Sequence, residues 1–332
     1  MSRSRRILFS LSLPVLLACA LFQSDLHAQT GLKKVRMGIS SNNVSYLALF
    51  VAFQRGFFRD EGIDLELILM SPTITNTAVL RGELDHNGAV TGVIGGAVRG
   101  QATKVLIFTV ARPLQFLMSK KEIKEPRQLK GKKIAGSSPG GTSTLLAYQA
   151  LRHFGLEPGK DVEVLPMGGT NAARLAVLDA GTVDASLLSV PENIIAAHKG
   201  YNELIFLGNA VEFPQNGFGT SEKRIRENPD ECLRMVRATL RGLMFLWDKK
   251  NQEQVLDVIL KQYKMNDRKL AGEMFQSALR VLTKDASVKP ESVQVLIDLQ
   301  RENAKVTKPV TVAEVVDYSF LDKARKELGL GR

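Results

Sequence analysis

The sequence predicts an α/β protein made of two similar lobes with a helical C-terminal extension. Three observations support this fold class. Short apolar segments that suit strands alternate with segments that suit helices, which is typical of a largely parallel sheet. A stretch that begins at Gly62 is repeated from Gly159, and beyond residue 221 the apolar side chains recur at helical spacing instead.

The N-terminal part of the first lobe is predicted over residues 32–118. Its first two strands are predicted at 35–39 and 64–70, where short apolar runs end in small polar residues. Helices are predicted over 45–57 and 75–80. A glycine follows the second helix, in the place where a left-handed glycine commonly ends a helix, and a further strand is expected after it.

The second lobe is predicted over residues 119–210, because this region repeats the first lobe. Three matches follow one another in the same order: Ile39-Ser40-Ser41 with Gly136-Ser137-Ser138, Gly62-Ile63-Asp64-Leu65-Glu66 with Gly159-Lys160-Asp161-Val162-Glu163, and Gly82-Glu83-Leu84-Asp85 with Gly181-Thr182-Val183-Asp184. Chance similarity of two strand–helix–strand units is the alternative. It explains one match more easily than three.

Residues 211–332 are predicted to return to the first lobe and to end in helices that pack on it. Asn228-Pro229-Asp230-Glu231 indicates a helix start, since it combines a capping residue, a proline at the first position and acids near the helix dipole. One buried helix face follows, made of Leu233, Val236, Leu240, Leu243 and Trp247. Further helices are predicted over 255–263, 270–282 and 291–303.

Residues 1–28 have the layout of a secretory signal peptide. Basic residues come first, an apolar run follows, and a small residue, Ala28, stands at the cleavage point. The predicted location is therefore the periplasm. Two alternatives stay open: a retained membrane anchor, and a lipoprotein tethered through Cys19, since the residues before it resemble a lipobox. Cys232 is the other cysteine, and two cysteines are too few for a disulfide framework.

The composition is that of a soluble globular protein, with 332 residues of which 44% are hydrophobic and 24% charged. The 45 basic residues against 34 acidic ones give a net charge of +11, which fits anionic partners or a basic solvated surface. Aromatic residues are only 6%, which argues against a nucleic-acid binder. The chain has no P-loop, His-Glu-x-x-His or Gly-x-Ser-x-Gly motif, so neither a cofactor nor a metal is predicted.

The candidate site consists of the loops expected at the carboxyl ends of the strands, where open α/β sheets bind ligands. These loops are small and polar in both lobes, and their hydroxyls, amides and backbone N–H groups suit a small anion or zwitterion. The predicted binding residues are Ser41, Asn42, Thr73 and Thr91 from the first lobe, Ser138, Gly141, Thr142, Thr170 and Ser189 from the second, and Asn216 on the returning segment. Helix capping is the alternative for each single loop.

Arg174 lies one turn into the helix after Thr170, and the sequence leaves its role open. Its guanidinium could reach a carboxylate or a sulfonate of a ligand. A surface or interlobe salt bridge is the alternative. No aromatic box and no pair of arginines marks a particular ligand.

Five segments carry a resemblance to a known family: residues 46–52, 56–66, 80–85, 129–134 and 176–184. They resemble the exported substrate-binding proteins of ABC importers for nitrate, sulfonates, taurine and thiamine-pyrimidine precursors. The resemblance implies a bilobal periplasmic-binding fold of type II that closes on its ligand, with two hinge strands near residues 109–118 and 213–220. A fungal pyrimidine synthase shares this fold, but its activity needs a cysteine- and histidine-rich cluster that the chain lacks.

The sequence therefore predicts an exported solute receptor, not an enzyme, that captures one small anionic or zwitterionic organic molecule between its lobes. Its predicted partners are that molecule and an ABC permease in the inner membrane, without nucleic acid, and the predicted state is a monomer. Two other classes stay open: a sensor that presents the solute to a membrane receptor, and an enzyme on the same scaffold. A cytoplasmic regulator is disfavoured, because the signal peptide stands where its DNA-binding helices would be.

Overall fold

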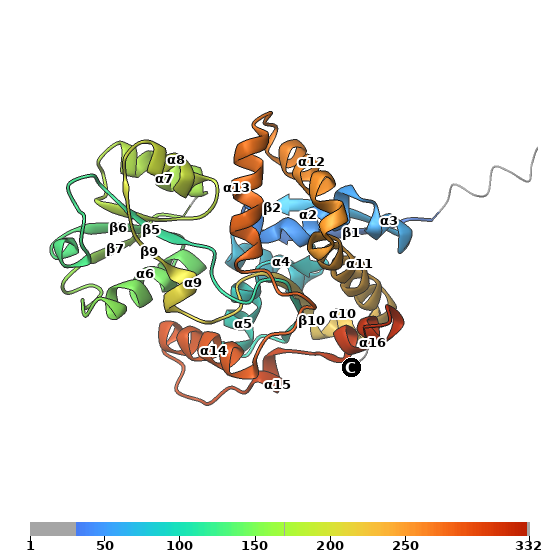
Figure 1. The fold of residues 1–332 in the computed structure, drawn as a ribbon. Coiled ribbons are helices and arrows are strands. Elements are labelled where there is room, and N and C mark those ends of the chain that lie inside the picture. The colour runs from blue at the N-terminus through green and yellow to red at the C-terminus, as the bar shows by residue number, and fades with distance from the viewer. Residues whose placement is uncertain (1–30, 169, 331–332) are drawn as a thin grey trace, which may run out of the picture.

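The computed structural model describes residues 31–168 and 170–330, and of Pro72 and Thr73 it describes the backbone alone. Over these ranges the chain forms two five-stranded sheets, one in each of two lobes that lie side by side (Figure 1). The predicted signal peptide and Cys19 lie outside the described residues. No helix within the described ranges is long and apolar enough to cross a membrane.

The two sheets have the same strand order, which confirms the prediction of two similar lobes. The first sheet runs β2 (Ile63–Leu69), β1 (Lys33–Ile39), β3 (His86–Asn87), β10 (Gly217–Ser221), β4 (Thr103–Phe108). The second runs β7 (Glu163–Pro166), β6 (Lys133–Gly136), β8 (Ala185–Leu188), β5 (Phe116–Ser119), β9 (Asn202–Phe206). In each sheet the first three strands are parallel and the fourth is antiparallel to both of its neighbours. The repeated segments lead into β2 and β7, which hold equivalent places.

The chain crosses between the lobes twice, over residues 109–115 and 211–216. The first crossover leads from β4 directly into β5. Residues 116–118 therefore lie in the second sheet, although the predicted boundary placed them at the end of the first lobe. The reason is that β5 pairs with β8 and β9, which come from the second lobe alone.

The two crossovers run side by side, and a third segment joins them. The Thr109 N–H donates to the Asn216 carbonyl at 2.8 Å, and the Thr109 carbonyl accepts from the Thr283 N–H at 2.9 Å. An isolated antiparallel bridge pairs Val110 with Leu282. The C-terminal extension is thus hydrogen-bonded to the segment that connects the lobes.

Helices cover both sheets. The first lobe has η1 (Val44–Tyr46), α2 (Leu47–Gln54), α3 (Phe57–Asp60), α4 (Pro72–Arg81) and α5 (Val90–Val98), and the second has η2 (Pro126–Leu129), α6 (Thr142–His153), α7 (Asn171–Asp179), α8 (Glu192–His198) and α9 (Leu207–Ala210). The extension has α10 (Glu222–Glu227), α11 (Pro229–Trp247), η3 (Lys249–Asn251), α12 (Gln252–Tyr263), α13 (Arg268–Leu279), α14 (Pro290–Ala304), α15 (Val312–Val315) and α16 (Ser319–Glu327). The single helix predicted over 45–57 is interrupted, because Gly56 adopts the left-handed conformation (φ 81°) between α2 and α3.

The extension packs on the first lobe mainly through α11, which lies against α2 and α3, and through α14, which lies against α5. At Gly242 the backbones of α11 and α2 come close, since a Cβ there would lie 2.3 Å from the Ala48 carbonyl oxygen and 2.8 Å from the Ala52 Cβ. The predicted apolar face is buried at Leu233, Val236, Leu240 and Leu243, and Trp247 is partly buried. The Trp247 indole N–H donates to the Thr283 carbonyl at 2.7 Å.

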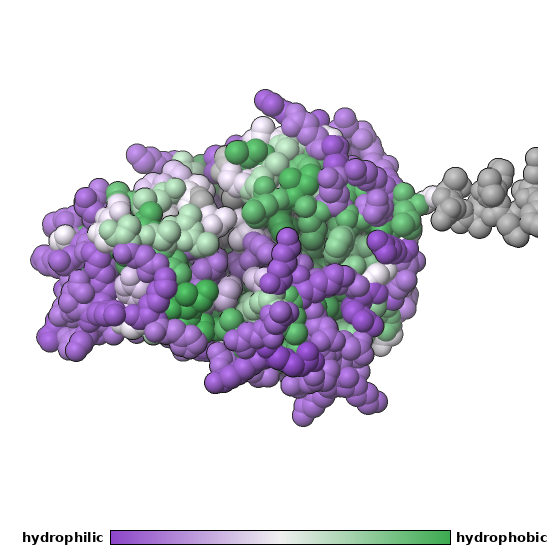
Figure 2. Space-filling model, turned by 90° about the horizontal axis from the view of Figure 1, so that it is seen from above, coloured by the Kyte–Doolittle hydropathy of each residue, from purple (hydrophilic) through white to green (hydrophobic). Residues whose placement is uncertain are grey.

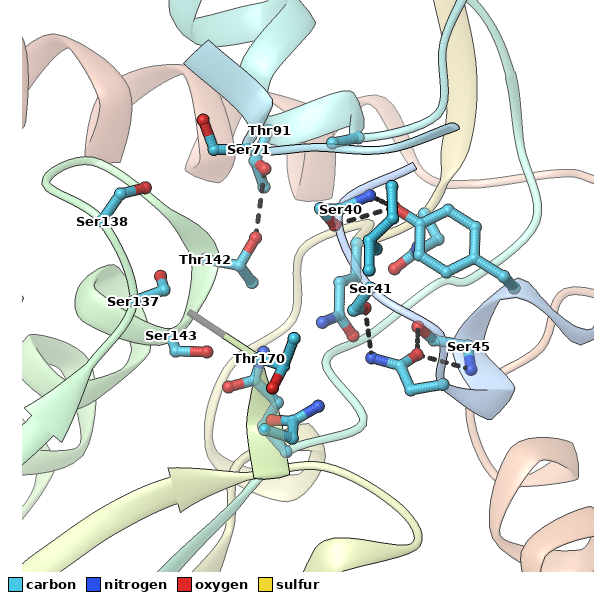
Figure 3. Close-up of a pocket in the computed structure, with 18 of the residues that line it drawn as sticks. Ser40, Ser41, Ser45, Ser71, Thr91, Ser137, Ser138, Thr142, Ser143 and Thr170 are labelled. Carbon is cyan, nitrogen blue, oxygen red and sulfur yellow. Dashed lines mark hydrogen bonds between the residues drawn. The ribbon is translucent and has the colours of Figure 1, made fainter. Parts of the chain in front are cut away.

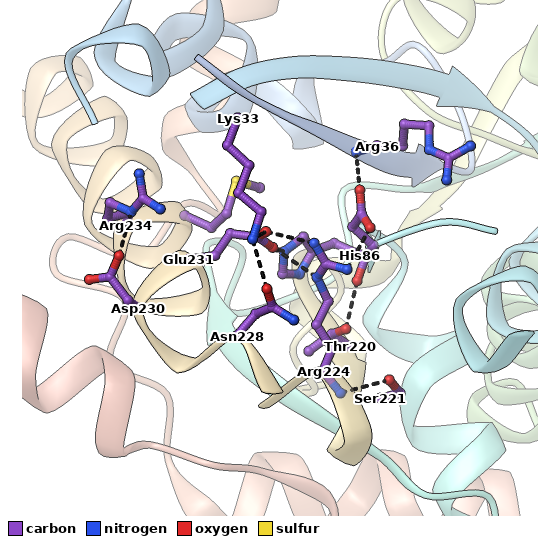
Figure 4. A network of polar contacts seen from close by, with 12 residues as sticks. Lys33, Arg36, His86, Thr220, Ser221, Arg224, Asn228, Asp230, Glu231 and Arg234 are labelled. Atoms are coloured by element: carbon purple, nitrogen blue, oxygen red, sulfur yellow. Dashed lines mark hydrogen bonds and ion pairs between the residues drawn. The ribbon is translucent and has the colours of Figure 1, made fainter. Parts of the chain in front are cut away.

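Glu231, in the first turn of α11, is buried at the centre of a polar network (Figure 4). Its carboxylate accepts two hydrogen bonds from Arg224, at 2.8 and 2.6 Å, and lies 2.6 Å from Lys33 Nζ and 3.3 Å from His86 Nε2. Burial alone would raise the pKa of Glu231, but hydrogen bonds from His86, Arg224 and Lys33 lower this pKa to about 2. Asn228 lies at the predicted cap position, yet its side chain makes no capping bond and accepts from Lys33 at 2.7 Å instead.

Candidate functional site

A cavity of about 220 Å³ lies between the two lobes. It is lined from the first lobe by Ser40, Ser41, Asn43, Ser45, Tyr46, Leu69, Met70, Ser71, Ala89 and Thr91, from the second by Ser137, Ser138, Thr142, Ser143, Gly168, Thr170, Asn171 and Arg174, and from the crossovers by Gln115, Gln215 and Asn216. Ten of these residues are serine or threonine, and they surround the cavity from both lobes (Figure 3). The size and the polar lining suit a solute smaller than a drug-sized ligand.

The surroundings of the cavity are partly apolar. Figure 2 looks onto the molecule from above, and in this view hydrophobic side chains gather between the lobes and over the first lobe. Leu69, which lines the cavity, is 54% exposed, and Met167, which precedes Gly168, is 42% exposed. A solute with a short apolar part would therefore meet apolar groups near the cavity as well as polar ones.

The loop after β1 is held in shape by its own side chains. Asn43 caps η1: its Oδ1 accepts from the Ser45 N–H at 3.0 Å, and its Nδ2 donates to Ser41 Oγ at 2.7 Å. The Tyr46 hydroxyl accepts from the Ser40 N–H at 3.2 Å and lies 2.9 Å from Ser40 Oγ. Burial raises the pKa of Tyr46, so this phenol stays neutral and keeps its hydrogen-bond donor.

Helices α4, α5, α6 and α7 begin at the cavity, and the first three of them have no side-chain cap. Helices α4, α5 and α6 follow Ser71, Ala89 and Gly141, and none of these residues accepts a capping bond from its helix. Helix α7 differs, because Thr170 Oγ1 accepts from the Ala173 N–H at 3.2 Å. Helix capping, the alternative to ligand binding, therefore accounts for the hydroxyl of Thr170. At the other three helix starts the backbone N–H groups are left to solvent or to a ligand.

The loop before α6 brings the backbone of the second lobe close to the cavity. Gly140 adopts the left-handed conformation (φ 68°). A Cβ at Gly141 would lie 2.5 Å from Ser137 Oγ and 2.9 Å from Ser138 Oγ, so only glycine fits there without a shift. Thr144 Oγ1 donates to the carbonyls of Ser137 and Ser138, at 3.2 and 3.1 Å, and fixes the loop to α6.

Arg174 supplies a positive charge to the cavity. Its side chain is only 5% exposed, its Nε donates to the Leu187 carbonyl at 3.0 Å, and its guanidinium donates to Asn171 Oδ1. Burial lowers the pKa of Arg174 to about 10, while attraction by Glu192 opposes the shift, so the guanidinium is charged at neutral pH. No other cavity-lining residue in the described part of the chain carries a charge. A surface salt bridge, one of the two alternatives, does not fit so buried a side chain.

The two lobes touch beside the cavity. Thr91 Oγ1 and Thr142 Oγ1 lie 3.1 Å apart, from opposite lobes (Figure 3). Gln300, on α14, donates from its Nε2 to the carbonyl of Thr91 at 3.2 Å and to the carbonyl of Gly140 at 3.4 Å. The arrangement is one in which both lobes can contact the same small molecule.

Six of the ten predicted binding residues line the cavity: Ser41, Thr91, Ser138, Thr142, Thr170 and Asn216. Asn42 is exposed and its Oδ1 accepts from a side chain of α12 at 2.8 Å, so it lies outside the lining. Ser189 is also outside, since it is buried and its Oγ donates to the Leu114 carbonyl at 2.7 Å. Gly141 stands at the start of α6 without lining the cavity, and the side chain of Thr73 lies outside the described residues.

The sequence did not single out the two glutamines on the crossovers. Neither Gln115 nor Gln215 stands directly after a strand. Their closeness to the cavity depends on how the two crossovers pair. The segment Pro214-Gln215-Asn216-Gly217 was a usable signal, but only Asn216 was chosen from it. Both glutamines are nearly buried, with exposed fractions of 4% for Gln115 and 6% for Gln215.

Metal-ligating and thiol groups play no part in the cavity as far as the structure describes it. Within the described ranges no group of three or more His, Cys, Asp or Glu side chains could hold a metal ion. Cys232 is fully buried on α11 and does not line the cavity. Burial raises the pKa of Cys232 to about 12, so its thiol is protonated at neutral pH.

Two similar α/β lobes, joined by two crossovers around a polar cavity, define a bilobal α/β protein with an interlobe cavity. The chain belongs to the NMT1/THI5-like family, whose model matches residues 43–269. A putative aliphatic sulfonates-binding protein of Bacillus subtilis (strain 168) is 25% identical over 313 residues, which cover 90% of each protein.

Solved structures share the fold at lower sequence identity. The periplasmic nitrate-binding protein NrtA of Synechocystis PCC 6803 is 16% identical, with a TM-score of 0.74 over 90% of both chains. The desulfurization enzyme DSZB is also 16% identical, with a TM-score of 0.63 over 89% of this chain and 99% of that one. Because the fold hosts solute binders and an enzyme, the function has to be argued from the site itself.

Proposed function

We propose that this protein is a solute receptor of an ABC importer that captures a small organic anion in the cavity between its lobes. One observation carries the proposal: the uncapped starts of α4, α5 and α6 and the guanidinium of Arg174 surround a cavity whose other lining groups are neutral. Helix N-termini and a guanidinium both favour negative charge. No carboxylate among the described residues lines the cavity to oppose it.

Capture by both lobes would couple binding to closure. A solute that hydrogen-bonds to Ser41 or Ser71 on one side and to Ser138 or Thr142 on the other binds the closed arrangement better than an open one, and so shifts the population toward closure. The closed form is then the form that a permease would recognise. The relatives named for sulfonates and for nitrate support an anionic solute here too.

The lining supports binding better than catalysis. Serine and threonine need a nearby general base to act as nucleophiles, and no histidine, cysteine or carboxylate of the described residues lines the cavity. The function is therefore best described as binding, even though an enzyme shares the fold.

We propose that the protein is exported, because the first 28 residues have the layout of a signal peptide with cleavage after Ala28, and that it is a free monomer in the periplasm. A lipid tether at Cys19 is the competing form. Fractionation of cells that express the full chain and its Cys19→Ser variant separates the two, because only a tethered protein would move from the membrane to the soluble fraction on substitution.

The binding proposal is tested by calorimetry on residues 29–332 with a panel of small sulfonates, carboxylates and phosphonates. The Ser138→Ala/Thr142→Ala variant removes two hydroxyls that line the cavity, and each hydrogen bond is worth about 1 kcal/mol, so affinity should fall about thirtyfold. The melting temperature should stay nearly unchanged. Ser277→Ala, on α13 outside the cavity, is the matched control and should bind as the parent does. Equal affinity of the double variant would move the site elsewhere.

A further inference from the structure

Gln300, on α14 of the extension, is hydrogen-bonded to both lobes at once. Its Nε2 donates to the Thr91 carbonyl of the first lobe at 3.2 Å and to the Gly140 carbonyl of the second lobe at 3.4 Å. The side chain is 1% exposed and does not line the cavity. Gln300 therefore joins the lobes from a place where it does not touch a solute.

Helix α14 is fixed to the first lobe by apolar packing. Val293, Leu296 and Ile297 are fully buried in a cluster that includes side chains of α5. Gly95 of α5 makes room for the glutamine, because a Cβ there would lie 2.8 Å from Gln300 Oε1. We therefore expect Gln300 to move with the first lobe when the lobes separate.

The contact of α14 with the second lobe is polar instead. Besides the bond from Gln300 to Gly140, the Asn303 Nδ2 lies close to this glycine, since a Cβ there would be 2.7 Å away. The partly exposed pair of Arg152 with Glu302 is the next contact. A cavity of about 350 Å³ lies beside these contacts, between α6 and β7 of the second lobe and α14. A polar contact with open space beside it separates more easily than a packed apolar one.

Gly140 belongs to the loop that places the start of α6 at the cavity. Ser138, before it, and Thr142, after it, both line the cavity. The Gly141 N–H donates to the Ser138 carbonyl at 2.9 Å and closes the loop into a turn. A bond from Gln300 to the Gly140 carbonyl therefore fixes where these two hydroxyls stand relative to the first lobe.

We propose that Gln300 is a latch that holds the lobes together and thereby a positioning residue for the binding site. It acts through the loop at Gly140 and touches no solute. The inference deepens the proposed capture of a solute between the lobes, because a receptor whose closed arrangement is already populated binds more tightly than one that is mostly open. Part of the free energy of closure then comes from outside the cavity and does not depend on the solute.

Small-angle X-ray scattering of the solute-free protein, residues 29–332, tests the latch without a ligand. Gln300→Met keeps the length of the side chain and removes its donor, so the ratio of closed to open molecules should fall about fivefold and the radius of gyration should rise. Gln294→Met is the matched control on the same helix. Gln294 donates to the Val310 carbonyl at 3.1 Å and to Asp298, both within the extension, so this variant should keep the parent radius.

A disulfide distinguishes opening from unfolding. Thr91 Oγ1 and Thr142 Oγ1 lie 3.1 Å apart, so the Thr91→Cys/Thr142→Cys pair can link the lobes. Oxidation of this pair should return Gln300→Met to the parent radius, and reduction should open the molecule again. Cys232 is fully buried and takes no part in the exchange.

Binding gives a second readout, with ethanesulfonate, propionate and methylphosphonate as probes. Gln300→Met should weaken each probe that the parent binds by up to the same fivefold, and Gln294→Met should not. If the parent binds none of the probes, the proposed capture of such an anion fails, and the radius still decides the fate of the latch.

Three results overturn the latch: a parent-like radius in Gln300→Met, an equal rise in Gln294→Met, or a rise that the disulfide does not reverse. A larger radius with unchanged affinity supports the latch and overturns the positioning role of Gln300. A lower melting temperature of Gln300→Met with parent radius and affinity reduces Gln300 to a packing contact of α14.

Discussion

Glu231 shows what one buried carboxylate requires. Without Lys33, Arg224 and His86, burying its charge in the first turn of α11 would destabilise the fold. With these partners, Glu231 connects β1, β3 and α10 to that helix. The sequence indicated Glu231 only as an acid near a helix dipole. Lys33 and His86 come from distant points of the chain, and Arg224 lies seven residues before Glu231 on another helix, so no local pattern predicted the network.

Replacing Glu231 by glutamine should destabilise the protein by about 3 kcal/mol at pH 7, because Arg224 and Lys33 would lose their buried counter-charge. The pKa of Glu231 is lowered from 4.5 to about 2 in the folded protein, so its contribution is present above pH 4.5 and is lost as the pH falls toward 2. The gap between parent and variant in the free energy of unfolding should therefore shrink over this range in urea titrations.

Glu66→Gln is the control for that experiment, since Glu66 is 46% exposed and pairs with Lys34 at the surface. It should change stability by less than about 1 kcal/mol. A gap between parent and Glu231→Gln that stays constant down to pH 2 would show that the folded protein does not hold this carboxylate ionised.

Neighbouring residues also show how far the site could be predicted. The loops expected at the strand ends do line the cavity, because parallel strands place their carboxyl ends together. The choice of side chain within a loop was less secure: Asn43 turns inward and caps η1, whereas Asn42 beside it turns outward to α12. The direction of such a turn depends on tertiary contacts, which the sequence does not display.

At the scale of elements, α11 was predictable because capping residues, proline and an apolar stripe all agreed on it. The break between α2 and α3 was not predicted, since the apolar pattern continues through Gly56 and only the backbone conformation interrupts it. The contact of α11 with α2 depends on a glycine that lies within the helix and interrupts no pattern. At Gly242 the two helices approach so closely that an added Cβ would contact the Ala48 carbonyl oxygen and the Ala52 Cβ.

Gly242→Ala should destabilise the protein by about 1–3 kcal/mol, although alanine favours a helix more than glycine does. The added methyl group would lie 2.3 Å from the Ala48 carbonyl oxygen, which belongs to the backbone of α2, so the two helices would have to separate. Urea denaturation of both proteins measures the change. Gly272→Ala, on α13 with no atom within 4 Å of its added Cβ, is the matched control and should be neutral or stabilising. A stable Gly242→Ala would mean that the α11–α2 contact is looser than described.

For the whole molecule, contacts between the lobes outside the cavity set how readily it closes. Arg152, on α6 of the second lobe, pairs with Glu302, on α14 of the extension. Both side chains are partly exposed, at 40% and 56%, so the pair contributes only modestly and salt screens it.

Glu302→Gln should shift the lobes toward an open arrangement by about twofold to fivefold, which corresponds to less than about 1 kcal/mol. Small-angle X-ray scattering of the ligand-free protein at low salt should then give a larger radius of gyration. The charge exchange Arg152→Glu/Glu302→Arg should restore the parent value, and high salt should remove the difference. An unchanged radius in Glu302→Gln would assign the closed arrangement to the threonine and glutamine contacts beside the cavity alone.

The strand order has a consequence for how the chain is made. β10, which fits between β3 and β4 in the first sheet, follows in sequence only after all five strands of the second sheet. A ribosome therefore releases β1 to β4 long before the strand that joins β3 to β4 exists, and the N-terminal lobe cannot be completed until residues 217–221 have emerged. The second lobe, whose strands are contiguous, can be finished first. Under the export proposed above, this order would help a chain that crosses a membrane unfolded, because its N-terminal lobe stays incomplete longest.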